Sequence, residues 1–171
     1  APDAGDRVLS YRGLTPGVDT HEKVLEVMGE PTAAALWYNY KLTYPSDRPG
    51  FVDVVHLAGP AKDAKLASIE AATVPPGYET EEAIRGKLGA PEYRLVMATW
   101  RLLDYSEQGL RFTTNAKGET TGVAYFAHGW PRVHSGARKA MDLSGKRLGA
   151  GDAGVPLAET PLECGTAEVD I

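Results

Sequence analysis

Apolar residues recur at helical spacing in two short stretches of the chain, "PGVDTHEKVLEVMGEP" at residues 16–31 and "PGYETEEAIRGKLGAP" at residues 76–91. In the first stretch Val24 and Met28 are four residues apart, and in the second Ile84 and Leu88 are. This spacing places each pair on one side of an α-helix. We therefore predict two short helices, each of which must dock on a sheet because helices of this length are unstable alone.

The two stretches share residues at six positions, separated in each case by the same interval (89 − 29 = 60). The identical pairs are Pro16/Pro76, Gly17/Gly77, Thr20/Thr80, Glu22/Glu82, Gly29/Gly89 and Pro31/Pro91. A threonine hydroxyl can accept from an unpaired N–H of the first helical turn. A glycine ends a helix at low cost, and a following proline prevents its continuation. The ungapped match predicts a tandem duplication.

Each predicted helix is followed by segments with the two-residue period of a half-buried strand. Residues 35–44, "ALWYNYKLTY", are predicted as one strand with Leu36, Tyr38, Tyr40, Leu42 and Tyr44 on one face and Trp37, Asn39, Lys41 and Thr43 on the other. Residues 51–57, 65–72 and 93–105 are predicted as further strands. Residues 109–127 are predicted as a hairpin turning at Asn115–Gly118, where residues that tolerate positive φ gather.

These elements predict an α+β fold of two tandem repeats, each a short helix followed by a three- to four-stranded antiparallel sheet. The first repeat covers residues 13–72 and the second covers 73–127. Residues 128–171 are rich in Gly, Pro and Ala without sustained periodicity, and form an irregular C-terminal extension. This extension is open to three interpretations: an arm laid over the body, a partner-binding arm, or a linker.

The composition narrows the function classes. The 171 residues are 43% hydrophobic and 24% charged, as is typical of a soluble globular protein. A net charge of −5 and a pI near 5.4 argue against a nucleic-acid partner, which needs a basic face. No apolar run approaches the ~20 residues of a membrane-spanning helix. The single cysteine, Cys164, has no partner for an internal disulfide.

The repeated pattern of Gly, Thr, Val or Ile, then Gly-x-Pro, followed by Trp- and Tyr-rich strands, resembles the BamE (SmpA/OmlA) superfamily of small envelope modules. The residues that carry the resemblance are Gly17, Thr20, Val24, Gly29, Pro31, Trp37 and Tyr38 in the first copy and Gly77, Thr80, Ile84, Gly89, Pro91 and Trp100 in the second. Two such modules in tandem are also similar in layout to beta-lactamase inhibitory protein. Both copies of the motif in this chain have one residue more between Gly and Thr than is usual in the BamE superfamily.

The resemblance implies a bacterial, exported and non-enzymatic protein that works through its surface. Such a protein would be periplasmic or secreted, or anchored in the outer membrane as a lipoprotein. The start "APDAGDR" is compatible with a removed export or lipoprotein signal, and equally with a trimmed chain. If the removed signal was that of a lipoprotein, the full-length form would carry a lipid anchor.

Candidate catalytic and metal-binding residues are few. His21 is predicted to be solvent-exposed in the first turn of its helix, and His56 to have a hydrogen-bonded structural role on a strand. His128 and His134 lie six apart with no second pair to complete a tetrahedral metal site. The chain has no G-x-S-x-G elbow and no phosphate-binding glycine loop. We therefore predict no catalytic residues, no metal and no cofactor.

The aromatic residues of the strands are more informative, although most of them are expected to be core. If Tyr38, Tyr40 and Tyr44 face the helix, Trp37, Asn39 and Lys41 line the opposite face. The alternation also allows the reverse assignment of the two faces. An exposed Trp beside Asn and Lys is typical of a protein-binding surface.

The sequence thus predicts a partner-binding surface made by Trp37, Asn39, Lys41 and Trp100, with another protein of the cell envelope as partner. The protein would act there as a scaffold component or an inhibitor, and replacing Trp37 by alanine would weaken binding with little loss of thermal stability. Two alternatives remain open. One is a small-molecule or glycan-binding protein, or a hydrolase, with a site between the repeats closed by His128, Trp130 and His134. The other is a structural domain of a larger protein.

Overall fold

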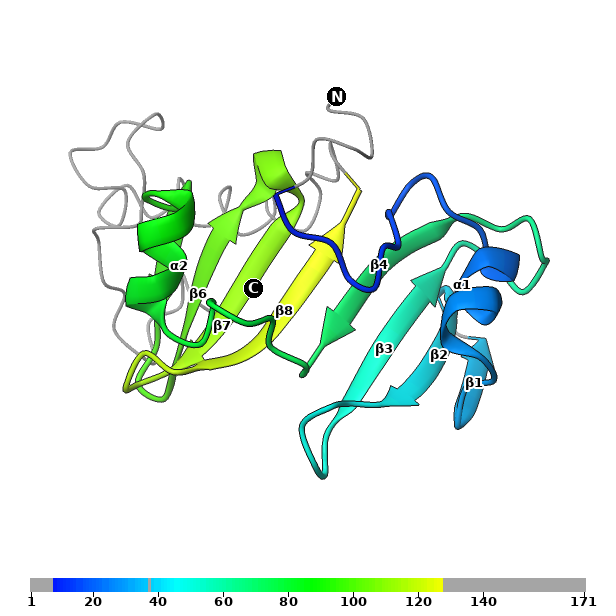
Figure 1. Ribbon diagram of the computed structural model, residues 1–171, viewed down its shortest axis with the longest axis horizontal. Coiled ribbons are helices and arrows are strands. Elements are labelled where there is room, and N and C mark those ends of the chain that lie inside the picture. The colour runs from blue at the N-terminus through cyan, green and yellow to red at the C-terminus, as the bar shows by residue number, and fades with distance from the viewer. Residues whose placement is uncertain (1–7, 37, 128–171) are drawn as a thin grey trace. The chain divides into compact units, whose positions relative to one another are not determined.

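The computed structural model describes residues 8–36 and 38–127. The first helix and the strands after it are α1 (His21–Met28), β1 (Ala33–Leu36), β2 (Tyr40–Pro45), β3 (Val52–Leu57) and β4 (Leu66–Ala71). They are followed by α2 (Glu81–Leu88), β5 (Tyr93–Val96), β6 (Trp100–Tyr105), the 3₁₀ turn η2 (Ser106–Gln108), β7 (Leu110–Asn115) and β8 (Thr120–Phe126). Figure 1 shows these elements along the chain.

The strands belong to one eight-stranded antiparallel sheet in the order β1-β2-β3-β4-β8-β7-β6-β5. The predicted fold class, two repeats each with its own three- to four-stranded sheet, is therefore wrong. The sheet is continuous because β4 pairs with β8, with Ile69 opposite Tyr125 and Ala71 opposite Val123. As the last strands of separate sheets, β4 and β8 would each expose a row of unpaired N–H and C=O groups, and their pairing satisfies both rows.

The described chain forms two compact units. The first contains α1, β1 to β4 and the part of β8 from Gly122 onward. The second contains α2, β5, β6, β7 from Arg111 and the first two residues of β8. Each unit is considered by itself below.

The two helices have the same ends, as the sequence predicts. The hydroxyls of Thr20 and Thr80 accept from the N–H three residues further on, at 3.4 and 3.1 Å. Gly29 and Gly89 close the helices with φ of 77° and 79° and an extended ψ near −162°. That backbone region is open essentially only to glycine, so these two positions fix where each helix stops.

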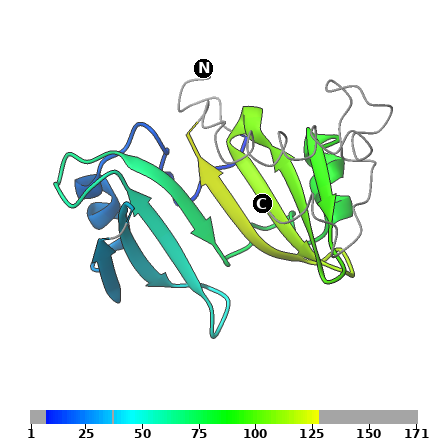
Figure 2. The same ribbon diagram turned by 180° about the vertical axis from the view of Figure 1, so that it is seen from behind.

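The core of the first unit lies between α1 and the strands. Leu42, Val55 and Ile69 stand opposite one another on β2, β3 and β4, and each is almost completely buried. Val24 of α1 is fully buried as well. The Tyr44 hydroxyl donates to the carbonyl at the C-cap of α1 at 3.0 Å, which shows that this face of β2 is the helix side. Figure 2 shows the sheet from behind, with α1 beyond the strands.

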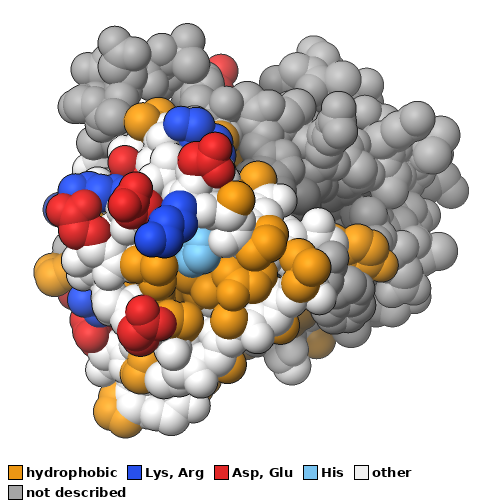
Figure 3. Space-filling view, turned by 90° about the vertical axis from the view of Figure 1, so that its right-hand side faces the viewer, with side chains coloured by type: hydrophobic (Ala, Val, Ile, Leu, Met, Phe, Trp, Pro, Cys, Tyr) orange, Lys and Arg blue, Asp and Glu red, His pale blue; other side chains and the backbone are white. Residues whose placement is uncertain are grey.

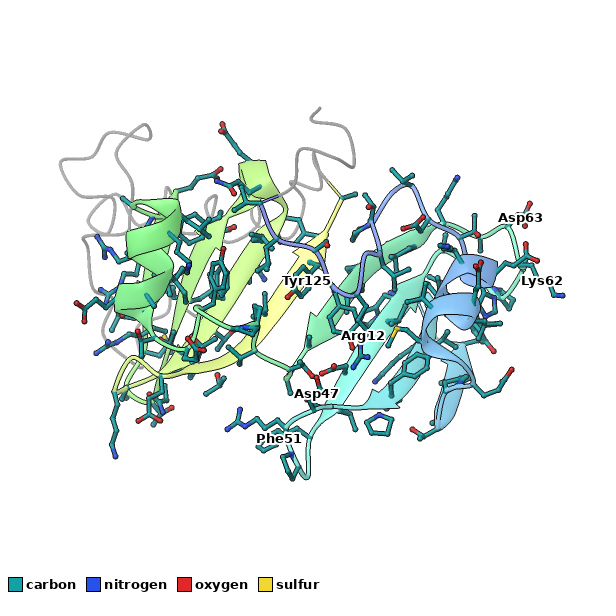
Figure 4. The ribbon with its side chains drawn as sticks, in the orientation of Figure 1. Arg12, Asp47, Phe51, Lys62, Asp63 and Tyr125 are labelled. Carbon is teal, nitrogen blue, oxygen red and sulfur yellow. The ribbon has the colours of Figure 1, made fainter. Side chains whose placement is uncertain are left out.

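A buried carboxyl ties the N-terminal segment to this core. Asp53 on β3 is fully buried. It accepts from the Tyr11 hydroxyl at 2.6 Å, the Thr73 hydroxyl at 2.7 Å, and the N–H groups of residues 72 and 73 at 2.8 and 3.1 Å. These four donors compensate the loss of hydration. On the surface beside them Arg12 reaches Asp47 at 3.3 Å (Figure 4).

The second unit repeats the anchoring of its helix. The Tyr105 hydroxyl on β6 donates to the Gly89 carbonyl at 2.8 Å, and burial raises the pKa of Tyr105 to about 12. Ile84 of α2 is fully buried, as is Phe112 of β7. The Phe112 ring stacks on Tyr78 with centroids 5.7 Å apart. These contacts fix α2 to the face of β6 and β7.

The prediction of single strands over 35–44 and 93–105 is wrong, because each segment is a hairpin: β1 with β2, and β5 with β6. In the first hairpin Leu36 lies opposite Tyr40, so both point to the same side. A loop of three residues keeps the even–odd alternation in step, and a continuous strand would show the same pattern. The strands predicted over 51–57 and 65–72, and the hairpin over 109–127, are confirmed as β3, β4 and β7–β8.

Candidate protein-binding surface

Strand β1 forms one end of the sheet. It pairs with β2 on one side, and no strand of the described chain lies on its other side. All four of its residues, Ala33–Leu36, are exposed. In an antiparallel edge strand about half of the backbone N–H and C=O groups point away from the neighbouring strand. Among the described residues, the outer side of β1 therefore presents backbone hydrogen-bonding groups that pair with no other strand.

The anchoring of Tyr44 to α1 assigns the two faces of this hairpin, because side chains alternate along a strand. The helix side carries Tyr44, Leu42 and Tyr40 on β2, with Ala34 and Leu36 opposite them on β1. The other side, which we call the open face, carries Thr43 and Lys41 on β2, with Ala33 and Ala35 opposite them. Lys41 therefore lies on the face away from the helix, which is one of the two assignments that the alternation allows.

Large apolar side chains gather at this end of the first unit. Leu36 is 69% exposed, Tyr38 is 92% exposed and Val27 on α1 is 38% exposed. Figure 3 looks at the end that carries α1 and β1, and shows a patch of hydrophobic side chains with charged side chains along one side of it. The predicted place of Tyr38 in the core is wrong, because Tyr38 lies in the loop that joins β1 to β2.

Polar side chains lie beside this patch on the open face. Lys41 is exposed, and His56 stands opposite it on β3. His56 Nδ1 lies 3.2 Å from Asn39 Oδ1, and its Nε2 lies 3.5 Å from Glu70 Oε2. The predicted hydrogen-bonded role of His56 is confirmed. The contact holds the Asn39 amide at the edge of the open face.

His21 is only 8% exposed, so its predicted exposure is wrong. Its Nδ1 donates to the Pro60 carbonyl at 3.0 Å, and its ring lies 5.5 Å from that of Tyr40. The cause is the loop between β3 and β4, which folds over the start of α1. The N–H groups of residues 21 and 22 donate to the carbonyls of Ala64 and Lys62 at 2.9 and 3.0 Å (Figure 4 labels Lys62).

In the second unit, the first residue of the helix is Glu81, which is 9% exposed. Its carboxylate accepts from Arg94 Nε at 2.5 Å and Nη2 at 3.3 Å, and from Arg101 Nη1 at 3.2 Å. Arg85 Nη1 lies 4.0 Å away. Burial alone would raise the pKa of Glu81, but the hydrogen bonds and charges of Arg94 and Arg101 outweigh burial and hold the pKa below its usual value. The cluster fastens β5 and β6 to α2.

The described residues that the sequence proposed as a binding surface belong to two different units. Asn39 and Lys41 lie two positions apart at the β1–β2 loop and the start of β2. Trp100 begins β6 in the second unit and is 36% exposed. Trp37 lies outside the described residues. Sequence reasoning missed the exposure of Leu36.

The described part of the chain shows no group of three or more His, Cys, Asp or Glu side chains that could hold a metal ion. Within the same residues no helix is long and apolar enough to cross a membrane. His128, Trp130 and His134, the residues of the alternative site, lie outside the described residues, as do Cys164 and the whole extension 128–171.

No protein-family model matches the sequence, and no curated protein matches it significantly. Among solved structures, the chain is similar to a DUF4309 family protein, YjgB, from Bacillus subtilis. The two share 17% sequence identity with a TM-score of 0.50, over 72% of this chain and 89% of the other. At this identity the likeness concerns the fold alone.

Proposed function

We propose that this protein acts by binding another protein of the bacterial cell envelope, as a scaffold component or an inhibitor. The observation that carries the proposal is the exposed end of the first unit, where Leu36 on the helix side of β1 and Tyr38 in the β1–β2 loop are exposed, with Asn39 in the same loop and Lys41 on the open face of β2. Exposed apolar side chains next to hydrogen-bonding groups are typical of interaction sites. Tyrosine is also among the residues that contribute most to binding energy at interfaces.

The predicted contact residues enter this proposal in two groups. Asn39 and Lys41 belong to the surface just described, next to Tyr38. Trp100 is a second contact candidate, exposed on the second unit. The location in the envelope, and a lipid anchor in the full-length form, rest on the resemblance of residues 13–127 to the BamE superfamily.

The test is capture of a partner from an envelope extract by the whole chain and by Tyr38→Ala. Because Tyr38 is 92% exposed, the substitution is expected to change the melting temperature by no more than about 1 °C. If Tyr38 is a binding contact, the affinity for the captured protein falls at least about fivefold, which corresponds to about 1 kcal/mol.

The matched control is Phe51→Ala. Phe51 is also an exposed aromatic residue, 49% exposed, but it lies in the turn between β2 and β3 under the Arg48 guanidinium. Retention of the partner should be equal for this variant and for the parent chain. Equal retention by Tyr38→Ala and by Phe51→Ala would refute the assignment of the surface.

A further inference from the structure

The two edge strands of the sheet are protected to different degrees. Strand β5, at one end, carries Arg94, whose guanidinium is held by Glu81, and Leu95, which is buried. Strand β1, at the other end, consists of three alanines and Leu36, all exposed, with neither a charge nor a proline. Exposed edges normally carry a charge, a proline or a cover, because they are templates for pairing with another chain.

We propose that β1 binds an extended segment of the partner protein as an added strand of the sheet. The inference rests on the proposed function and specifies how that surface works. The outward N–H and C=O groups of β1 supply the main-chain hydrogen bonds, as in other cases of strand addition. A strand of four residues is about 13 Å long, so the bound segment has about four to six residues.

The open face selects an acidic side chain in the partner. Ala35 on β1 stands opposite Lys41 on β2, which in turn stands opposite His56 on β3. A residue of the added strand opposite Ala35 is separated from Lys41 only by a methyl group. The flexible Lys41 side chain can extend over the methyl group of Ala35. A negatively charged residue of the added strand would then lie close to the Lys41 ammonium group, and such cross-strand pairs of opposite charge are favourable.

The helix side selects an apolar side chain. Here Leu36 and Ala34 lie on β1, with Tyr40 and Leu42 behind them. Leu36 is exposed, and the added strand would cover it. The partner segment therefore alternates apolar and acidic residues, which is the period that matches a strand.

The probes are synthetic seven-residue peptides, capped at both ends. One alternates valine with glutamate, a second alternates valine with lysine, and a third is the valine–glutamate peptide with a central proline. The full chain, labelled with ¹⁵N, is titrated with each peptide and its amide resonances are followed. The valine–glutamate peptide should shift the amides of Ala33–Leu36 and slow the hydrogen exchange of those that point away from β2. The proline peptide should bind at least about fivefold more weakly.

Two charge variants test whether Lys41 attracts an acidic residue of the added strand across Ala35. In Lys41→Glu the preference should reverse, with the glutamate peptide weakened about two- to fivefold and the lysine peptide strengthened. The control Lys117→Glu makes the same charge change at an exposed turn of the second unit and should leave both affinities unchanged.

The inference is overturned if no peptide shifts the β1 amides at millimolar concentration, or if the shifts lie elsewhere. It is also overturned if β1 amides change on dilution without peptide and light scattering gives the mass of a dimer, because the edge then pairs with a second copy. Loss of peptide binding at β1 with retained, Tyr38-dependent partner capture would refute strand addition and leave the proposed function standing.

Discussion

Replacing Glu81 by glutamine removes the negative charge that three arginines of the second unit surround. The carboxylate contacts Arg94 at 2.5 and 3.3 Å, Arg101 at 3.2 Å and Arg85 at 4.0 Å. Glutamine has nearly the same shape and keeps one oxygen as an acceptor. The substitution therefore tests the charge rather than the packing.

The expected loss of stability in Glu81→Gln follows from the burial of the ion pairs that Glu81 makes. Breaking a buried ion pair costs about 3–5 kcal/mol, because the remaining charge is left uncompensated. The side chains of Arg94 and Arg101 are 17% and 27% exposed, so water recovers part of this loss. We expect Glu81→Gln to lower the free energy of unfolding by about 1.5–3 kcal/mol. For a chain of this length that corresponds to a fall in melting temperature of about 3–12 °C.

Glu82→Gln is the matched control. Glu82 lies next in the same first turn of α2 and is exposed. Its substitution removes the same charge from the positive end of the helix dipole, an effect of about 0.3–1 kcal/mol. Urea unfolding of both variants and the parent chain therefore separates the arginine contacts from the dipole.

The pH dependence of the stability difference between the parent chain and Glu81→Gln can refute this explanation. Because the pKa of Glu81 is lowered in the folded state, its contribution is complete above the unfolded value of about 4.3 and is lost as the pH falls through the folded value. The difference in stability between the parent chain and Glu81→Gln should thus narrow below about pH 4. A difference unchanged between pH 7 and pH 3, or an equal loss in Glu82→Gln, would refute the reasoning.

Two further substitutions test the core of each unit. Tyr11→Phe removes one of four donors to the buried Asp53 carboxyl and should lower the free energy of unfolding in urea by about 1–3 kcal/mol. The control Tyr38→Phe, at an exposed position, should lower it by less than about 0.5 kcal/mol. Equal urea midpoints for the two variants would contradict the role given to Tyr11. Ile84→Val removes one methylene from a fully buried site and should lower the free energy of unfolding in urea by about 0.5–1.5 kcal/mol. No measurable decrease would show that the contact of α2 with the sheet is loosely packed.

The sequence by itself determined the features that depend only on residues close together in the chain. Thr20 and Thr80 cap their helices, and Gly29 and Gly89 end them, because hydroxyl geometry and the steric freedom of glycine act within one turn. The turn at Asn115–Gly118 is local in the same sense, and Gly118 has the positive φ of 83° that it needs. The alternation also placed Lys41 on the opposite face to Tyr40 and Tyr44, but only the contact of Tyr44 with the end of α1 shows which face is the helix side.

The tertiary structure decided what depends on residues far apart in the chain. The pairing of β4 with β8 joins residues more than fifty positions apart, and no period within either strand specifies which edge it will meet. His21 and Glu81 open helices of similar sequence, yet one is buried under the β3–β4 loop and the other among arginines of β5 and β6. Local propensities fix where an element begins and ends. Which surfaces are buried, and which edge stays open, is fixed by the free energy of contacts that only the assembled sheet brings together.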